Sequence, residues 1–170
     1  MKRIFNLSLR LAILCIVASA GLSSIYQLTA DKIVENQRIE LENKLKQVLP
    51  EADRFEEVSG RFIGYHNGEQ VGIAVRADPQ GYGGPISMLI GIDTNDTVTG
   101  IAIISHKETP GLGKKIENDA FREQFEGKKD NQVKLNKDSS EGTIDAITAA
   151  TISSRAVARA VYEALEKDKP

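Results

Sequence analysis

The sequence predicts an α+β domain that is carried on an N-terminal membrane helix and an amphipathic stalk. Three observations lead to this fold class: an uncharged apolar segment over residues 11–28, an amphipathic segment after it, and short β-prone runs that give way to a C-terminal helical pattern. With 170 residues the chain has room for one domain with a hydrophobic core and an appendage.

Composition limits the chemistry that the chain can support. A formal net charge of -2 provides no basic field for nucleic acid, so we expect no nucleic-acid partner. The single cysteine, Cys15, cannot form an internal disulfide. With only two histidines beside it, no zinc-type cluster of thiolate and imidazole ligands can be assembled, and we expect no metal site.

Residues 11–28 predict a single transmembrane helix. Eighteen helical residues extend about 27 Å, close to the roughly 30 Å of bilayer hydrocarbon. Lys2, Arg3 and Arg10 precede the segment without an acidic residue, so residues 1–10 are expected in the cytoplasm and the rest of the chain outside. A cleaved signal peptide is the alternative, because Ala18–Ala20 has the small-x-small form of a cleavage site. Both readings export the bulk of the chain.

Residues 29–50 predict an amphipathic stalk helix. Apolar residues recur mostly at intervals of three and four from Ile33 to Leu49, and Pro50 ends the pattern. No Gly or Pro separates this helix from the membrane segment, so the two are expected to form one rod. The remaining residues, 51–170, are then the extracytoplasmic domain.

An antiparallel sheet is expected after Pro50, because the hydrophobic period shortens and turn residues separate the apolar runs. The expected strands are residues 61–66, 71–77, 86–93 and 98–105, and Asp93–Asp96 is expected to connect the last two as a hairpin.

Helices are expected to flank this sheet. Residues 118–128 predict a short helix, 132–135 another strand, and 142–147 a last extended piece. Residues 151–168 predict the C-terminal helix, whose apolar face is formed by Val157, Val161, Ala164 and Leu165.

Two segments combine unusual composition with possible chemistry, and the first is Glu108–Gly113. Pro110, Gly111 and Gly113 are typical of a plain surface turn. The same segment presents bare backbone donors and one apolar side chain, Leu112, which suits contact with a flat ring. Residues 81–85 form a second loop of this kind.

The second segment, residues 148–154, leads into the C-terminal helix. Thr148, Thr151 and Ser153 are all acceptable helix caps. Alternatively, the small residues Ala149 and Ala150 leave the helix start open to an anion such as a phosphate, which its amides and dipole would stabilise.

These segments together resemble RnfG, the FMN-binding G subunit of the Rnf electron-transport complex, and, more distantly, the C subunit of the sodium-pumping NADH:quinone oxidoreductase. The resemblance is carried by "GYGGPI", "HKETPGLG" and "DAITAATISS", with the membrane helix and the stalk ending "QVLP". In that family a separate flavin transferase joins FMN through its phosphate to the last Thr of a D-x-x-[S/T]-G-A-T motif. The matching residues here are Asp145, Thr148, Ala149, Ala150 and Thr151, and Ala149 stands where the family usually has Gly.

The resemblance implies covalent FMN on Thr151, with Thr148 as the nearest rival acceptor. It also implies that the flavin lies against the first segment, where Glu108 fixes the loop and Leu112 packs on the ring; the residues concerned are Glu108, Thr109, Pro110, Gly111, Leu112 and Gly113. Lys114 and Lys115 either offset charge on a reduced flavin or are solvated surface.

By the same resemblance the chain is an electron-relay subunit of a membrane-bound ion-translocating ferredoxin:NAD oxidoreductase, with no catalytic residue of its own. No G-x-G-x-x-G opens a helix after a strand, so NAD binding is not expected here. One membrane helix cannot supply an ion path, and partner membrane and peripheral subunits are therefore implied. The alternatives are an anchored assembly or sensor module without flavin and a soluble periplasmic flavoprotein released by signal cleavage.

Overall fold

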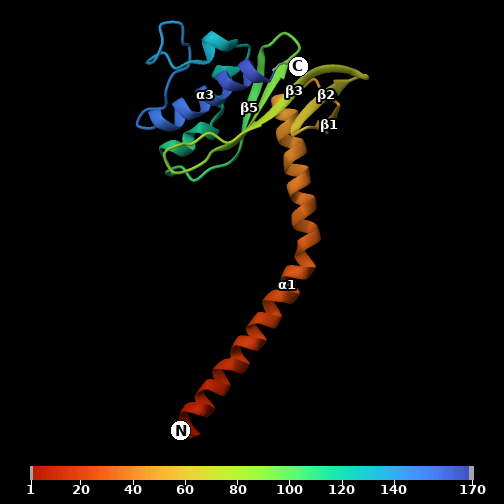
Figure 1. Ribbon diagram of the computed structural model, residues 1–170, viewed down its shortest axis with the longest axis vertical. Coiled ribbons are helices and arrows are strands. Elements are labelled where there is room, and N and C mark those ends of the chain that lie inside the picture. Colours follow the sequence, from red (N-terminus) through yellow and green to blue (C-terminus); the bar gives the residue numbers. More distant parts are fainter. Residues whose placement is uncertain (1, 169–170) are drawn as a thin grey trace. The chain divides into compact units, whose positions relative to one another are not determined.

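The computed structural model describes residues 2–168, except for the side chains of residues 2–5, 7, 24, 27 and 31. The chain divides after Leu41 into two compact units, which are described one at a time. The described residues of the first unit are all helical, and the second unit contains a five-stranded sheet with helices (Figure 1).

Helix α1, Lys2–Val48, runs without a break through the segments expected to form the membrane helix and the stalk. Within it, Ser8–Ala30 is the one described stretch that is long and apolar enough to cross a membrane, with a mean hydropathy of 1.8. This stretch is wider than the expected 11–28. Large apolar side chains such as Leu14 and Leu22 are exposed along it and therefore require apolar surroundings.

The second unit is built on an antiparallel sheet with the strand order β1-β2-β3-β4-β5. Its strands are β1 Arg54–Val58, β2 Arg61–His66, β3 Glu69–Ala77, β4 Ser87–Asp93 and β5 Val98–Ser105. The antiparallel sheet and the last four strands confirm the sequence prediction. β1 was not expected, because four of its five side chains are exposed and no apolar alternation marks it.

Local turn chemistry explains why the strands follow one another as hairpins. Ser59 and Gly60, and again Asn67 and Gly68, have positive φ angles, as two-residue hairpin loops require. At the β4–β5 turn, Asp93 Oδ1 accepts hydrogen bonds from the amides of Asn95 and Thr97, each at 2.8 Å. The expected hairpin at Asp93–Asp96 is therefore confirmed.

One face of the sheet packs against helix α3, Thr151–Lys167, to form the main hydrophobic core (Figure 1). Ile90 and Ile103 of the sheet meet Val157 and Val161 of the helix in this core, and all four are buried. Ala164 and Leu165 are buried as well, so the apolar face expected for the C-terminal helix is confirmed.

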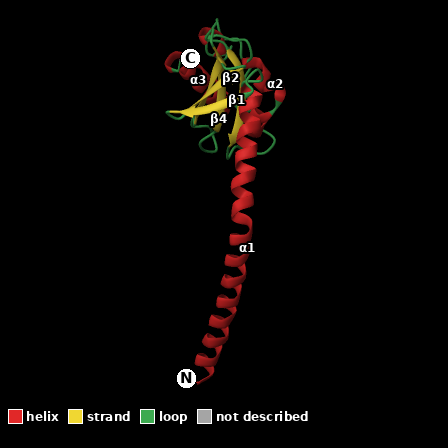
Figure 2. Cartoon of the chain, turned by 90° about the vertical axis from the view of Figure 1, so that its right-hand side faces the viewer, coloured by secondary structure: helices red, strands yellow, loops and turns green. Residues whose placement is uncertain are grey.

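The opposite face of the sheet packs against the last turns of α1, from Glu42 onward (Figure 2). Four glycines, which we name the glycine seam, make room for this helix end: Gly64, Gly72, Gly91 and Gly100. A Cβ at Gly91 would overlap the carbonyl oxygen of Val48, which also accepts a hydrogen bond from Thr99 Oγ1. The second compact unit thus includes α1 residues that lie before the boundary expected at residue 51.

Short helices fill the segment between β5 and α3: η1 Gly113–Glu117, α2 Asp119–Arg122, η2 Glu123–Phe125 and η3 Asp130–Val133. The expected strand at 132–135 is wrong, because η3 occupies its first half and Gln132 Oε1 accepts from the amide of Lys129, which closes the turn. Leu135 makes only an isolated bridge to Ile144, which is also the one bridge within the expected extended piece at 142–147. The expected helix at 118–128 is limited to α2 and η2.

Candidate functional site

A cleft of about 380 Å³ lies where three segments far apart in sequence meet. One wall comes from the loop at residues 81–84, another from residues 108–113, and the third from the start of α3. The lining residues are Tyr82, Glu108, Thr109, Leu112, Gly113, Ala149, Ala150, Ile152 and Ser153. A cleft of this size is within the range of small-molecule and cofactor sites, roughly 300–1,000 Å³.

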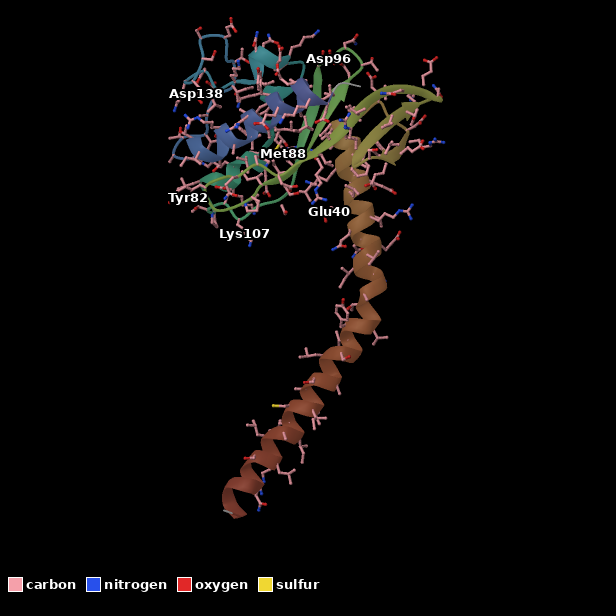
Figure 3. All side chains as sticks on the ribbon, in the orientation of Figure 1. Glu40, Tyr82, Met88, Asp96, Lys107 and Asp138 are labelled. Carbon is pink, nitrogen blue, oxygen red and sulfur yellow. The ribbon has the colours of Figure 1, made fainter. Side chains whose placement is uncertain are left out.

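Three large apolar side chains in the cleft walls are turned toward solvent. Tyr82 is 72% exposed, Ile152 53% and Leu112 42%. Figure 3 shows Tyr82 beside Lys107 at one edge of the domain. Because these side chains come from all three walls and each leaves a large part of its surface exposed, they provide contact area for a flat apolar ligand.

Glu108 connects the three walls. Its side chain is buried, and the residue is only 5% exposed. Oε1 accepts a hydrogen bond from the amide of Gly83 at 3.0 Å, and Oε2 accepts one from the Ser153 hydroxyl at 2.6 Å. Glu108 therefore bonds directly to the second loop and to α3.

Neighbouring atoms explain why several residues of these loops are glycines. A Cβ added at Gly81 or at Gly113 would overlap the carboxylate of Glu108, and one at Gly83 would overlap the Lys107 carbonyl. These glycines are required because loop backbone lies directly against Glu108 and its neighbour. Gly111 differs, since it has a φ of 80° and open space around it, as a turn residue does.

His106 supports the same segment from behind. Its Nδ1 accepts a hydrogen bond from the amide of Glu108 at 3.0 Å, so the ring proton belongs on Nε2, which lies 2.9 Å from Glu117 Oε1. Lys114 is exposed, lies 4.0 Å from Glu117 and does not line the cleft; Lys115 is also exposed and outside the lining.

No side-chain cap is present at the start of α3. Ala150, which has no side-chain oxygen, occupies the N-cap position, and the expected caps Thr148, Thr151 and Ser153 do not serve there. Ser153 instead bonds Glu108. Thr151 is the first helical residue and is half-buried, whereas Thr148 is exposed in the preceding turn.

The turn before α3 is held by Ser154 and strained at Ala149. The Ser154 hydroxyl accepts from the amide of Ile147 and donates to the carbonyl of Ala150, both at 3.0 Å. Ala149 has a φ of 63°, in the left-handed region that favours glycine. Ala149, which stands where the family usually has Gly, is thus at a position where glycine has a conformational advantage.

The structure brings together only part of the expected site. Glu108, Thr109, Leu112, Gly113, Ala149 and Ala150 line the cleft, whereas Pro110, Gly111, Thr148 and Thr151 neighbour lining residues in the chain without lining it themselves. Asp145 lies outside it. Its amide donates to Gln124 Oε1 at 2.7 Å, and its carboxylate accepts from Asn136 Nδ2.

Three lining residues were not expected as site residues: Tyr82, Ile152 and Ser153. Tyr82 stands in the bare loop at 81–85, and Ile152 is an apolar residue at an exposed first-turn position. The apolar character of these two residues between small ones was a usable signal. Ser153 gave no such signal, because its partner lies 45 residues away in sequence.

Two family models match the chain. One, described as an FMN-binding domain, covers residues 81–166, and the other, the RnfG N-terminal region, covers residues 1–48. The chain belongs to the RnfG family.

Several RnfG proteins cover nearly the whole chain. The G subunit of the proton-translocating ferredoxin:NAD(+) oxidoreductase complex of Clostridium ljungdahlii is 34% identical over 169 residues, which are 96% of this chain and 91% of that protein. The G subunit of the Na(+)-translocating complex of Acetobacterium woodii is also 34% identical, over 97% of this chain and 91% of its own length.

Solved structures of NqrC proteins, from a related system, share the fold of this RnfG protein. The C subunit of the Na(+)-translocating NADH-quinone reductase from Parabacteroides distasonis has a TM-score of 0.52 and 25% identity, covering 62% of this chain and 58% of that one. NqrC of Shewanella oneidensis has a TM-score of 0.53 at 18% identity, over 72% of this chain and 67% of its own. The likeness confirms an α+β domain of the FMN-binding type.

Proposed function

We propose that this chain is the electron-relay subunit of a membrane-bound ion-translocating ferredoxin:NAD oxidoreductase and that it carries FMN as a phosphoester on Thr151. Membership of the RnfG family and the match to the FMN-binding domain support the flavin and the complex. The observation that carries the attachment site is the uncapped start of α3, where Thr151 stands as first residue beside a cleft with apolar walls.

The residues present fit FMN in shape and in charge. Tyr82, Leu112 and Ile152 offer exposed apolar surface for the ring. A phosphoester at the first turn of α3 keeps one negative charge, which the helix dipole stabilises by about 0.3–1 kcal/mol. Because that energy is too small to retain the cofactor, a covalent bond supplies the retention and the cleft supplies the orientation.

Bound FMN supplies reversible one- and two-electron transfer, which no side chain of this protein provides. The Thr151 hydroxyl gives up its proton and forms the new bond to phosphorus. Condensation with free FMN would release water and is uphill in water, so the donor must be an activated flavin dinucleotide. Its pyrophosphate bond breaks and a nucleoside monophosphate leaves. A separate flavin transferase would perform this step.

The chain is expected to work within a larger assembly. Among residues 2–168 only Ser8–Ala30 has the length and composition of a membrane span, and one helix cannot form an ion path. We propose that residues 1–10 are cytoplasmic and that the flavin domain faces the other side. The two relatives named above are described as translocating protons and Na(+) at equal identity to this chain, so the coupling ion is left open.

Replacement of Thr151 tests the attachment site. In cells that express the transferase, Thr151→Ala should lose the in-gel flavin fluorescence of this protein, because the acceptor oxygen is gone. Thr148→Ala, which removes the exposed threonine three residues earlier, is the matched control and should stay fluorescent. Fluorescence that persists in Thr151→Ala and disappears in Thr148→Ala would move the attachment to Thr148.

A second candidate function is an anchored assembly or sensor module without flavin. The strained Ala149 favours it, since a turn built for glycine has been filled with another residue. An unmodified Thr151 peptide from cells that contain the transferase would support the module.

A further inference from the structure

We propose that Glu108 is a positioning residue: it holds the walls of the cleft to the first turn of α3 and so fixes the direction of Thr151, without itself contacting the flavin. The consequence for Thr151 rests on the proposed function. We name the hydrogen bonds from Glu108 to Gly83 and Ser153 the clamp. The clamp itself rests only on contacts within this chain.

Both carboxylate oxygens of Glu108 are already engaged. Oε1 takes the Gly83 amide and Oε2 takes the Ser153 hydroxyl, whose 2.6 Å distance is within the range of a charge-assisted O–H···O bond. Ser153 is as deeply buried as its partner, at 1% exposure. A carboxylate with both oxygens occupied and 5% exposure is suited to join protein segments rather than to receive a ligand.

Glycines enclose the carboxylate on two further sides. Gly81 and Gly113 approach it so closely that a Cβ at either position would overlap its atoms. The loop at 81–84 and the segment at 108–113 are therefore both shaped around Glu108. Behind it, His106 accepts from the Glu108 amide and holds the backbone of this residue in place.

The bond to Ser153 sets the rotation of α3. Residues two positions apart on a helix point about 200° apart around its axis. Ser153 is turned inward onto Glu108, so Thr151 is turned outward, in agreement with its half-buried state. Ser154, also buried, ties the preceding turn through Ile147. The two serines thus leave Thr151 as the first-turn hydroxyl that faces outward.

Covalent flavin per chain tests the clamp in the full-length protein made with the transferase. Glu108→Ala should lower loading at Thr151 by about tenfold, since the buried Ser153 hydroxyl and the Gly83 amide both lose their acceptor. Glu108→Gln should load like the unchanged protein, because its amide oxygen can accept from Gly83 and its N–H can donate to the Ser153 hydroxyl. Glu126→Gln, an exposed carboxylate outside the cleft, is the control and should load normally.

Two further measurements keep the test decisive if Glu108→Ala folds poorly. Ser153→Ala removes only the bond to α3, keeps a helix-favouring residue, and should reduce loading severalfold. In full-length protein made without the transferase, hydrogen exchange at residues 81–84 and in the first turn of α3 should be faster in Glu108→Ala than in Glu108→Gln.

Normal loading and exchange in Glu108→Ala would overturn the clamp, and so would a Glu108→Gln variant as defective as Glu108→Ala, which would assign the effect to charge. If the unchanged protein carries no flavin on Thr151, the proposed function fails, and the exchange measurement still decides whether the clamp exists.

Discussion

Ala149 adopts a backbone conformation that costs a residue with a side chain about 1–2 kcal/mol. It persists because both ends of the turn are held: Ile147 is bonded to Ser154 on one side, and α3 begins on the other. The strain is therefore local to the turn that precedes Thr151.

Ala149→Gly should raise the free energy of unfolding by about 0.5–1 kcal/mol. Relief of the left-handed strain exceeds the additional freedom that glycine gives the unfolded chain. Urea unfolding of the full-length chain in detergent, followed by near-UV circular dichroism, measures the change. Ala120→Gly in α2 is the control and should be destabilising; a destabilised Ala149→Gly would show that the turn is not strained.

At the level of residues, the sequence predicted the segments of the site better than their internal chemistry. The run from Glu108 to Gly113 was expected to accommodate a ring, and Leu112 does line the cleft. Gly113, however, is accounted for by Glu108, whose partners Gly83 and Ser153 lie 25 and 45 residues away. Such long-range bonds leave no local pattern in a sequence, so the clamp became visible only in the fold.

Among the elements, the end of α1 packs closely on the sheet. The glycine seam allows helix backbone to lie directly on the strands, and Gly91 faces Gly100 across β4 and β5. The two positions differ in tolerance: a Cβ at Gly91 would overlap Val48, whereas one at Gly100 would lie 3.2 Å from the Gln47 oxygen.

Gly91→Ala should therefore destabilise the second unit by about 2–4 kcal/mol, while Gly100→Ala should change its stability by less than about 1 kcal/mol. The overlap at position 91 involves the backbone of α1, which cannot move without separating from the sheet. At position 100 the tight contact is partly offset, because alanine leaves the unfolded chain less flexible than glycine does. Thermal unfolding of full-length protein gives both values. Equal losses at the two positions would contradict the described packing.

A salt bridge joins α3 to the segment before it. Arg155 donates to Asp138 through Nε at 2.6 Å and through Nη2 at 2.8 Å. The Arg155 hydrogen bond, with added attraction from Arg155 and Lys137, lowers the pKa of Asp138 from its usual 3.8, and Asp138 in turn raises the pKa of Arg155.

Because the folded pKa of Asp138 is depressed, its contribution to stability is present above pH 3.8 and is lost as the pH falls through the folded pKa. Asp138→Asn should thus be less stable than the unchanged protein at pH 5–7. This gap in the free energy of unfolding should close toward pH 2. Unfolding midpoints across this range measure it. Arg155→Gln should show the same closing gap, and a gap that is constant with pH would exclude this linkage.

The sequence predicted those elements that have a clear apolar period and missed those that do not. β3 to β5 and α3 carry buried faces and β2 is partly buried, whereas β1 is held by pairing with β2 alone and exposes most of its side chains. Residues 130–133 form a 3₁₀ turn instead of the expected strand, because the Gln132 side chain bonds the backbone of Lys129. That side-chain bond, rather than hydrophobic period, decides the local structure.

For the whole molecule, the proposed orientation places residues on opposite sides of a membrane. In a Cys15→Ser background, Asn95→Cys in the exposed β4–β5 turn should react with a membrane-impermeant maleimide in intact cells. Asn6→Cys, before the span, should react only after the membrane is opened. The reverse pattern would place the flavin domain in the cytoplasm, and labelling of both sites in soluble protein would indicate signal cleavage.

The most direct test of covalent FMN on Thr151 is the mass of the tryptic peptide 138–155 from protein isolated from cells that contain the transferase. This peptide includes Thr143, Thr148 and Thr151, so fragmentation can distinguish them. We expect the added mass of FMN less one water, located on Thr151. An unmodified peptide, or the same added mass on Thr143 or Thr148, would contradict the proposed attachment.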